Sequence, residues 1–551
     1  MPPYYPDQPR WVDIAESLKP TLRVTEALPR GLVEPVADAA AFQGWRMRPV
    51  EGLAALPTKA LGAGEGFTLD FGEHVVGTFR MKLKAVGLAQ DAPVRIKFIF
   101  AEVPAETAEP FDPYPGQLSR AWLQDEVVNV DVLPCTLRLP RRYAFRYVKI
   151  EVLATSPCFR VALADFACDT VTSADPAAVA PPSEALPPEF QELDRVSLRT
   201  LRNCMLTVFE DGPKRDRRLW LGDLRLQALT NYASFRNFAL VKRCLYLFAG
   251  LAREDGLVAS CVYEVPEPAI GHCFILDYAA LFGPALLDYA EASGDWAAAR
   301  ELWPVALRQM DFVLAHVGAD GLFVDPGTWW IFIDWHAGLE KTVSMHGLAV
   351  YALRRMLALA KALSEHCGTA APGGAERQSH THTAEGGGAT GLASFPALIE
   401  RMTVAARKAW RDASGLFASG TKRQISWASQ AWMVLGGVLS PTEGAAALKA
   451  LPGRADAIPP AGPYLYHHVV EAMLACGLRD EAVALLQSYW GGMLRAGATT
   501  FFEVYDPADD RLSPYRSPLI NSYCHAWSCT PAYFIRKGFA PPPATRTATR
   551  T

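Results

Sequence analysis

The chain has 551 residues, of which 50% are hydrophobic and 20% charged, a composition typical of a globular protein with more than one domain. Its formal net charge of −4 argues against nucleic acid and anionic membranes as partners, because no excess of basic residues is left to bind phosphate. Eleven cysteines without a C-x-x-C pair are expected to be reduced and mostly buried. The N-terminal residues show no basic start followed by an apolar run, and no stretch of 18 apolar residues occurs later, so we predict a cytoplasmic protein.

Residues 67–152 alternate apolar and polar side chains in short runs separated by turn residues. The runs, rich in β-branched and aromatic residues, lie at 67–86, 94–103, 127–134 and 143–153. This pattern indicates half-buried strands, and we predict a β-sandwich. The Pro-, Ala- and Ser-rich stretch 173–188 is typical of a linker, so the first domain with its linker is placed at residues 1–185.

After residue 189 the apolar residues recur every three or four positions, which predicts α-helices. The runs lie at 190–209, 224–252, 278–294 and 296–317, and further ones lie near 342–364, 395–412, 427–438, 465–476, 479–494 and 522–536. Helices paired as sequential hairpins must curl into a bundle, a solenoid or an α/α toroid to bury their apolar faces. No repeat of about 34–47 residues is visible, which argues against a simple solenoid. We place this all-α domain at residues 186–540.

The helical domain is interrupted at residues 367–394 by a Gly-rich stretch with few large apolar side chains. Such a composition predicts a disordered surface insertion. It contains His380 and His382, but an H-x-H pair in a Gly-rich loop is more often solvated than bound to a metal. Residues 541–551 are predicted to be a tail.

The segment 210–223, EDGPKRDRRLWLGD, concentrates charge around Trp220 between two helical stretches. Its acids are Glu210, Asp211, Asp216 and Asp223, and its cations are Lys214, Arg215, Arg217 and Arg218. One interpretation is a solvated turn whose salt bridges contribute little energy. The placement of Trp220, Gly212 and Gly222 favours a functional loop instead.

This segment resembles the motif of the family 78 glycoside hydrolases, the bacterial α-L-rhamnosidases, which runs D-x-P-x-R-E-R and then W-x-G-D. Four other segments are similar to that family: LDFGEHVVG at 69–77, FIDW at 332–335, TTFFEVYDP at 499–507 and SYCHAWSCTP at 522–531. The resemblance implies a multidomain protein in which a β-sandwich is followed by an all-α (α/α)6 barrel. It also implies hydrolysis with inversion at the anomeric carbon.

Position by position, the resemblance implies that Asp216 is the general acid and Glu503 the general base. It places Asp211 and Asp223 on substrate-binding carboxylates. The family has Glu at the acid position, and Asp216 is one methylene shorter, so the cleft is drawn in, a neighbour such as Asp223 donates the proton, or the activity is weakened or altered.

The chemistry of glycoside cleavage requires the same two roles. An oxocarbenium-like transition state needs a protonated carboxyl at the leaving oxygen and an ionised carboxylate on the opposite face, roughly 6.5–9.5 Å apart for inversion. Neighbouring acids would raise the pKa of Asp216, and the four cations of the loop would lower it. Glu503 follows Phe501 and Phe502, which predicts a partly apolar wall; the alternative is an acid that merely flanks a helix.

Aromatic side chains are the other candidates for sugar contact, because a ring with one polar handle suits an amphipathic ligand. The tryptophans considered are Trp220, Trp329, Trp330, Trp335, Trp432 and Trp527, each of which could instead be a core residue. His525 could bind a sugar hydroxyl or be a buried structural histidine, and His272 and Asp277 are weaker candidates. The predicted substrate-binding set is Asp211, Arg215, Trp220, Asp223, Asp334, Trp335, Trp432, His525 and Trp527.

We therefore predict an inverting hydrolase that removes terminal α-L-rhamnose from a glycoside or oligosaccharide. No metal-ligand spacing, phosphate loop or G-x-S-x-G elbow is found, so neither a metal nor a cofactor is expected. Two alternatives stay open: a related barrel glycosidase whose basic cluster binds a uronide, and a carbohydrate-binding protein with weakened catalysis. Spacing alone fixes neither the aglycone nor the oligomeric state.

Overall fold

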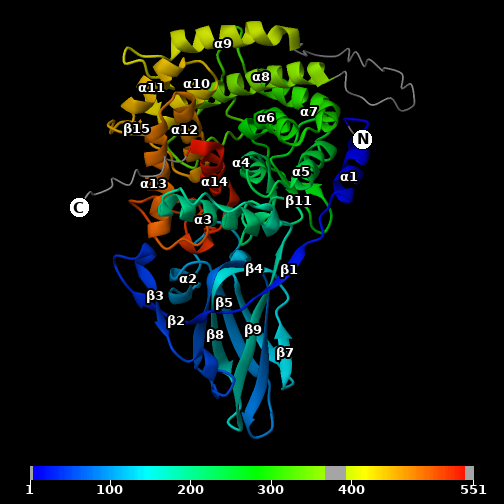
Figure 1. Cartoon of the computed structure of the whole chain (residues 1–551), viewed down its shortest axis with the longest axis vertical. Coiled ribbons are helices and arrows are strands. Elements are labelled where there is room, and N and C mark those ends of the chain that lie inside the picture. Colours follow the sequence, from blue (N-terminus) through cyan, green and yellow to red (C-terminus); the bar gives the residue numbers. More distant parts are fainter. Residues whose placement is uncertain (1–3, 367–391, 540–551) are drawn as a thin grey trace, which may run out of the picture. The chain divides into compact units, whose positions relative to one another are not determined.

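The computed structural model describes residues 4–366 and 392–539 (Figure 1). The chain divides into two compact units. The helical unit contains Met1–Lys19, Leu219–Tyr232 and Phe238–Ala482, and the sheet unit contains Pro20–Arg218, Ala233–Asn237 and Val483–Thr551. The two units are described separately below.

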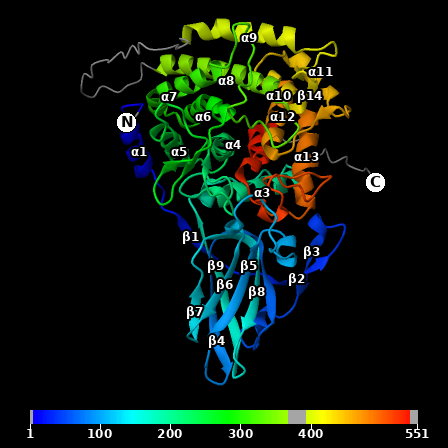
Figure 2. The ribbon, with the colours of Figure 1, turned by 180° about the vertical axis from the view of Figure 1, so that it is seen from behind.

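The sheet unit is built on one nine-stranded antiparallel sheet. Its strands are β1 (Arg23–Ala27), β2 (Gly31–Ala37), β3 (Trp45–Val50), β4 (Gly66–Gly87), β5 (Val94–Ala101), β6 (Asp125–Val130), β7 (Cys135–Arg138), β8 (Tyr143–Ala154) and β9 (Phe159–Thr172). The main order is β1-β9-β4-β8-β5-β6, while β2 joins β3 to β4 and β7 pairs with β4 (Figure 2). The four predicted strand runs correspond to β4, β5, β6 and β8, and the other five strands were not predicted.

Strand β4 is long enough to serve two groups of strands. Its first part pairs with β2 and β8, and its last part pairs with β7 and β9, with a register shift between Asp70 and Val75. Inward-facing aromatic residues fill the space enclosed by the strands; Phe98 and Phe100 are two positions apart and therefore point to the same face. The ring of Phe100 stacks on Tyr143 with centroids 3.9 Å apart.

The sheet unit also contains helices. They are α2 (Ala105–Ala108), α3 (Pro188–Cys204) and α14 (Pro531–Phe534), and α13 (Arg479–Arg495) is divided between the two units. Helix α3 packs against both β9 and α14. Its proline at the first helical position is favourable, because that position has no intrahelical partner for an N–H group.

The helical unit contains ten α-helices in its described residues. They are α1 (Gln8–Ser17), α4 (Leu221–Tyr232), α5 (Phe238–Gly250), α6 (Leu276–Ser293), α7 (Trp296–Leu314), α8 (Thr342–Glu365), α9 (Phe395–Ala409), α10 (Trp427–Leu435), α11 (Pro441–Ala450) and α12 (Pro463–Ala475). Two small sheets join the loops: β10 (Leu219–Trp220), β11 (Cys261–Tyr263) and β12 (Ala269–Ile270), and β13 (Ala418–Ser419), β14 (Gln424–Ser426) and β15 (Ala457–Ile458).

Alternate helices of this unit form a connected inner series. Each of α4, α6, α8, α10 and α12 contacts the next in that order, and α4, α6 and α10 are buried on nearly every face. Helices α7 and α9 bury one face only. A helix that is apolar all round must be covered on every side. Helices α4, α6 and α10 are therefore in an inner layer, and α7 and α9 are in an outer layer.

The predicted helix near 522–536 is largely wrong. This segment consists of the 3-10 helix η8 (Ala526–Ser528), the single turn α14 and the π-helical turn η9 (Ile535–Phe539), with irregular chain before them. Its backbone N–H groups bond to distant segments instead of within a helix: His525 donates to Phe501 and Ala526 to Asp211. Local periodicity does not record such long-range partners.

The predicted insertion and tail fall mainly outside the described residues. Of 367–394, only Leu392–Ser394 are described, and they form the 3-10 helix η6. His380, His382 and the tail 541–551 lie outside the described part of the chain. None of the helices that the structure describes combines the length and apolar composition needed to cross a bilayer.

Candidate active site

The charged loop before β10 folds back on itself inside the sheet unit. Asp211 organises it: its carboxylate accepts hydrogen bonds from the backbone N–H groups of Asp216 and Arg218, each at 3.1 Å. Gly212 is required at the next position, because a Cβ there would lie 2.6 Å from Ser522 Oγ and 2.7 Å from the Arg215 carbonyl oxygen. The loop is thus tightly packed and is not a solvated turn.

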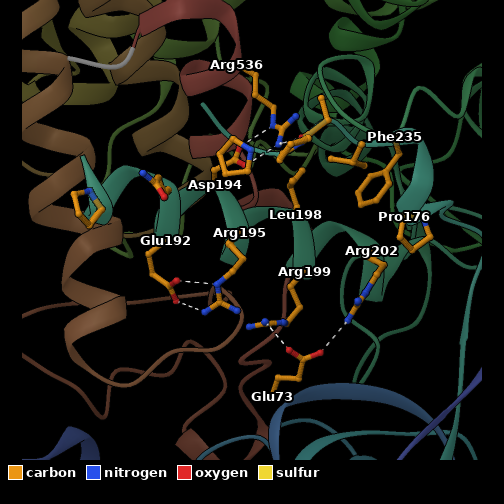
Figure 3. A pocket seen from close by; sticks show the side chains of 16 residues that line it. Glu73, Pro176, Glu192, Asp194, Arg195, Leu198, Arg199, Arg202, Phe235 and Arg536 are labelled. Atoms are coloured by element: carbon orange, nitrogen blue, oxygen red, sulfur yellow. Dashed lines mark hydrogen bonds and ion pairs between the residues drawn. The ribbon is translucent and has the colours of Figure 1, made fainter. Parts of the chain in front are cut away.

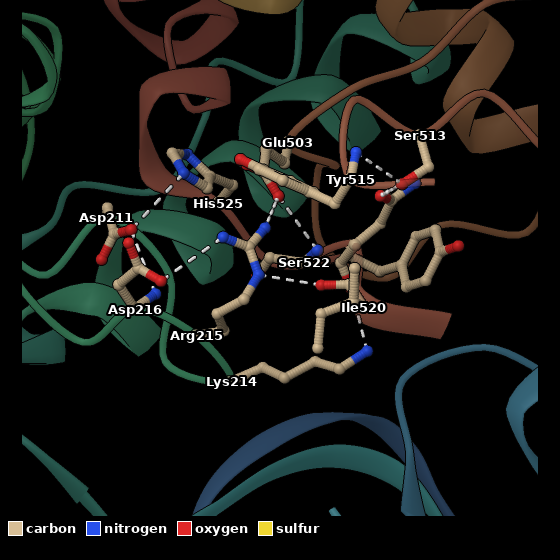
Figure 4. A network of polar contacts seen from close by, with 12 residues as sticks. Asp211, Lys214, Arg215, Asp216, Glu503, Ser513, Tyr515, Ile520, Ser522 and His525 are labelled. Atoms are coloured by element: carbon tan, nitrogen blue, oxygen red, sulfur yellow. Dashed lines mark hydrogen bonds and ion pairs between the residues drawn. The ribbon is translucent and has the colours of Figure 1, made fainter. Parts of the chain in front are cut away.

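Arg215 lies at the centre of a polar network in this loop (Figure 4). Its side chain is 2% exposed and forms an ion pair with Glu503, 288 positions later in the chain. Its second terminal nitrogen lies 3.6 Å from Asp216 Oδ1, and Nε donates to the Ile520 carbonyl at 2.8 Å. Arg215 is thus buried between two carboxylates, and its predicted contact with substrate stays a prediction.

Glu503 is buried and accepts hydrogen bonds on both carboxylate oxygens. Tyr515 donates its hydroxyl to Oε1 at 2.5 Å, and the Ser522 backbone N–H donates to Oε2 at 3.2 Å. Burial raises the pKa of Glu503, and Arg215, Tyr515 and Ser522 oppose that rise by stabilising the ionised form. The Trp527 indole donates to the Glu503 carbonyl at 3.0 Å, which fixes the backbone of the same residue.

Asp211, Asp216 and the neighbouring His525 form the other side of the network. Burial and the charge of Asp216 raise the pKa of Asp211 to about 7. Asp216 is the most accessible of the loop acids preceding β10, with 18% of its side chain exposed, and Arg218 lies 3.7 Å from it. His525 Nε2 lies 4.0 Å from Asp211 Oδ2, and burial lowers the pKa of this histidine, so it is neutral.

The remaining cations of the loop anchor it to the rest of the sheet unit. Lys214 is 1% exposed, pairs with Glu106 of α2, and donates to the carbonyls of Leu519 and Asn521 at 3.0 and 2.9 Å. Arg217 donates to two backbone carbonyls, those of Pro213 and Arg142, each at 2.8 Å. These cations therefore hold the loop and the 519–521 segment together.

In the helical unit, the predicted residues gather around the start of α4 and the 331–335 segment. Trp220 is half-buried in the β10–β11 pair, and Asp223 is buried in the first turn of α4. Gly222 permits close packing, since a Cβ there would lie 2.3 Å from the Tyr278 ring. The predicted contacts of Trp220 and Asp223 with sugar stay predictions.

Asp277 holds the 331–335 segment in place. Its carboxylate accepts from the N–H groups of Phe332 and Ile333 at 2.8 and 3.0 Å, and Ile333 has φ +52°, a conformation that β-branched residues rarely adopt. Asp334 accepts from the Ala461 N–H at 2.7 Å, and burial raises its pKa to about 7. Trp335 meets Phe332 edge to face, with centroids 5.1 Å apart.

Trp432 is fully buried, and its ring packs against Tyr351 and His468 with centroids 5.8 and 4.5 Å apart. A sugar could reach it only if these neighbours moved, so its predicted sugar contact stays a prediction. The donor atoms of His467, His468 and Glu471 lie within 4.8 Å of one another and could hold a metal ion. However, the Arg225 guanidinium lies 3.5 Å from Glu471, and such a cation opposes a second positive charge.

The two halves of the chain match two consecutive domain families. Residues 29–170 match the glycosyl hydrolase family 78 α-rhamnosidase N-terminal domain. Residues 186–538 match the bacterial α-L-rhamnosidase six-hairpin glycosidase domain, which covers more than half of the chain. The chain belongs to glycoside hydrolase family 78. It is therefore a glycoside hydrolase, as the motif around Asp216 implied.

Solved structures of rhamnosidases are similar to this chain. A rhamnosidase from Klebsiella oxytoca with rhamnose bound is 43% identical, with a TM-score of 0.89, and the match covers 96% of this chain and 98% of that one. A family 78 rhamnosidase of Bacillus sp. GL1 (22% identity, TM-score 0.69) is matched over 89% of this chain and 49% of its own. The α-L-rhamnosidase of Streptomyces avermitilis complexed with L-rhamnose (16% identity, TM-score 0.64) is matched over 94% and 44%.

The last two likenesses show the fold alone, and this chain spans about half the length of those two proteins. None of the curated proteins matches the sequence.

The structure brings together six of the predicted residues in the sheet unit: Asp211, Arg215, Asp216, Glu503, His525 and Trp527. Sequence reasoning missed Tyr515, which contacts both partners of the central ion pair; its ring lies under the Arg215 guanidinium at 4.3 Å. Tyr515 stands in an irregular stretch without a motif, so no signal in the sequence marks it. Asp277 was considered, but its hold on the 331–335 backbone was not predicted.

Proposed function

We propose that this glycoside hydrolase removes terminal α-L-rhamnose by an inverting mechanism, with Asp216 as general acid and Glu503 as general base. The observation that carries the proposal is the Arg215 guanidinium, which contacts both carboxylates. Inversion needs the two carboxyls apart by roughly 6.5–9.5 Å, enough for a water molecule at the anomeric carbon. Two carboxylates on one planar cation are close to each other without touching, which suits that requirement. The rhamnose bound by the Klebsiella oxytoca relative supports the choice of sugar.

Glu503 suits the base because three donors stabilise its ionised form against the effect of burial. Arg215 and the Ser522 N–H engage one oxygen and Tyr515 the other, so the carboxylate is oriented before a substrate arrives. A carboxylate oxygen has two lone-pair directions, so Oε1 can accept from a water molecule as well as from Tyr515. The base would take one proton from that water as it attacks the anomeric carbon.

Asp216 suits the acid because it is more exposed than Glu210 and Asp211, so its carboxyl can reach a glycosidic oxygen. The pKa of the neighbouring Asp211 is raised to about 7, so Asp211 can hold a proton near neutral pH beside the Asp216 backbone. Arg215 and Arg218 then stabilise the carboxylate that remains after proton transfer. Asp216, which replaces the family's Glu, is therefore surrounded by Arg215, Arg218 and Asp211.

The finer description of the fold is also a proposal. The inner series of α4, α6, α8, α10 and α12 and the six-hairpin description of the family support an (α/α)6 barrel, and the two groups of strands joined by β4 support a β-sandwich. The domain boundaries at 1–185 and 186–540 and the cytoplasmic location stay predictions.

The uronide alternative depended on free cations in the charged loop. Lys214, Arg215 and Arg217 are engaged with protein groups, so the alternative now depends on Arg218, whose side chain is 26% exposed. The other alternative is a binding protein with weakened catalysis, and a measurement of turnover distinguishes it from the proposal.

The test is hydrolysis of an aryl α-L-rhamnoside by the wild type, Asp216→Asn and Glu503→Gln, with Glu184→Gln, an exposed linker acid, as the matched control. We expect losses of about 10²–10⁴-fold in the first two variants and none in the control, as removal of a general acid or base requires. NMR of the first-formed rhamnose should show the inverted anomer. An inert wild type that binds rhamnose, or release of the retained anomer, would refute the proposal.

A further inference from the structure

A cavity lies in the sheet unit, apart from the Arg215–Glu503 network. It has a volume of about 490 Å³ and lies between α3 and the 176–182 linker, with Glu73 of β4, Phe235 and Arg536 completing its wall (Figure 3). None of the residues that contact Arg215 or Glu503 in the described structure lines it. Its size is within the range of about 300–1,000 Å³ typical of small-molecule sites.

One wall of this cavity is a row of arginines. Arg195, Arg199 and Arg202 are spaced by four and three positions, so they lie on one face of α3. Arg195 pairs with Glu192 and Arg536 pairs with Asp194, which is buried beneath the surface of the cavity.

Glu73 is the carboxylate that the remaining arginines share, although Arg199 also donates to the Thr499 carbonyl at 2.9 Å and Arg202 to Asn203 Oδ1 at 3.3 Å. It lies 2.6 Å from Arg199, 3.7 Å from Arg202 and 3.9 Å from Arg30, so three guanidinium groups share one carboxylate. Burial lowers the pKa of Arg199 to about 10, and Arg195 and Arg202 add to this effect while Glu73 opposes it. Four arginines and three carboxylates line the cavity, so the lining carries one net positive charge that a further anion would balance.

The opposite wall is mainly apolar. It is formed by Pro176, Val179, Pro181, Pro182 and Phe235, and Leu198 of α3 adds an apolar side chain beside the arginines. Prolines lose little conformational entropy when a ligand orders the wall, and a phenyl ring offers a face to a flat ligand. The cavity therefore combines a surface for an apolar ring with a cationic edge.

We propose that this cavity is a second binding site, separate from the hydrolytic one, for a small organic anion with an aromatic ring and a carboxylate. The carboxylate lies against Arg199 and Arg202, where guanidinium groups form paired hydrogen bonds, and the ring lies between Phe235 and the linker prolines. The site does not depend on the proposed hydrolysis, because no residue of the acid–base network takes part in it.

The probe for this site is 2-naphthoate, with its neutral methyl ester as the matched ligand, measured by titration calorimetry at pH 7. We expect the acid to bind at least tenfold more tightly than the ester. Arg202→Gln, a part-exposed position, should weaken binding of the acid tenfold or more and leave the ester unchanged. Arg138→Gln, an exposed arginine of β7 outside the cavity, is the control and should bind like the wild type.

Three results would overturn the proposal: no binding of 2-naphthoate at millimolar concentration, equal binding of acid and ester, or displacement of the probe by saturating rhamnose. Circular dichroism checks that Arg202→Gln is folded, and Arg195→Gln, whose side chain is 52% exposed, replaces it if it is not. Rhamnoside hydrolysis by these variants should stay at the wild-type rate, which separates this site from the proposed active site.

Discussion

The hydrogen bond from Tyr515 to Glu503 predicts a specific change in the pH dependence of hydrolysis. Tyr515→Phe removes the hydroxyl that donates to Oε1 at 2.5 Å but keeps the ring that lies under the Arg215 guanidinium. The ionised form of Glu503 accepts this bond more strongly than the neutral carboxyl does. The substitution therefore destabilises the carboxylate and raises the pKa of Glu503.

The size of the change follows from the strength of a hydrogen bond to a charged group. Such a bond contributes about 1.5–3 kcal/mol, and one pKa unit corresponds to about 1.4 kcal/mol. The pKa of Glu503 should thus rise by about 1–2. A general base must be ionised, so the acid limb of the kcat/KM profile should move to higher pH by the same amount. At a fixed acidic pH the rate should fall about 10–100-fold, with a smaller loss on the plateau.

The assay is hydrolysis of an aryl α-L-rhamnoside from pH 4 to pH 9 by the wild type and Tyr515→Phe. Tyr489→Phe is the matched control, because Tyr489 donates its hydroxyl at 3.0 Å to the neutral carbonyl of Tyr505 in the same region of the chain. Its acid limb should stay in place. An equal loss at every pH in Tyr515→Phe, or the same displacement in both variants, would show that Tyr515 has a structural role only.

Three further variants test the packing of the two units. Lys214→Met leaves Glu106 as an unpaired buried charge, so urea unfolding should show a loss of about 3–5 kcal/mol. The pKa of Asp334 is raised from 3.8 to about 7, so its contribution to stability is present at low pH and is lost as the pH rises through 7. The free energy of unfolding of the wild type should therefore fall by about 4 kcal/mol more than that of Asp334→Asn between pH 4 and pH 8, as measured by urea unfolding at both values. Gly212→Ala forces a Cβ to within 2.6 Å of Ser522 Oγ, so the melting temperature should fall with a cost of about 1–3 kcal/mol, and kcat/KM should drop with it.

Buried charges in the sheet unit hold together segments that are distant in the chain. Glu106, on α2 next to the sheet, holds Lys214, and Lys214 in turn holds the 519–521 carbonyls. Two segments about 300 positions apart in the chain are joined by this one ammonium group. The positions of Arg215 and Glu503 therefore depend on the sheet unit, which links its fold to the proposed chemistry.

The sequence by itself determined the local structure and the family. Alternation of apolar residues identified β4, β5, β6 and β8, and spacing by three and four identified most of the helices, because strand and helix geometry repeat on that scale. The motif around Asp216 identified the family, since its residues are consecutive and can be read directly.

Only the tertiary structure decided which residues meet. The pairing of Arg215 with Glu503, the bond from Tyr515 and the use of Lys214 as an anchor all join segments that no local pattern relates. The stretch near 522–536 was wrongly predicted as one helix, because the N–H groups of His525 and Ala526 bond to Phe501 and Asp211, far away in the chain. The periodicity of apolar residues indicates which face of a helix or strand is buried. The position of a buried charge depends on a partner of opposite charge, which the folded chain can supply from any part of the sequence.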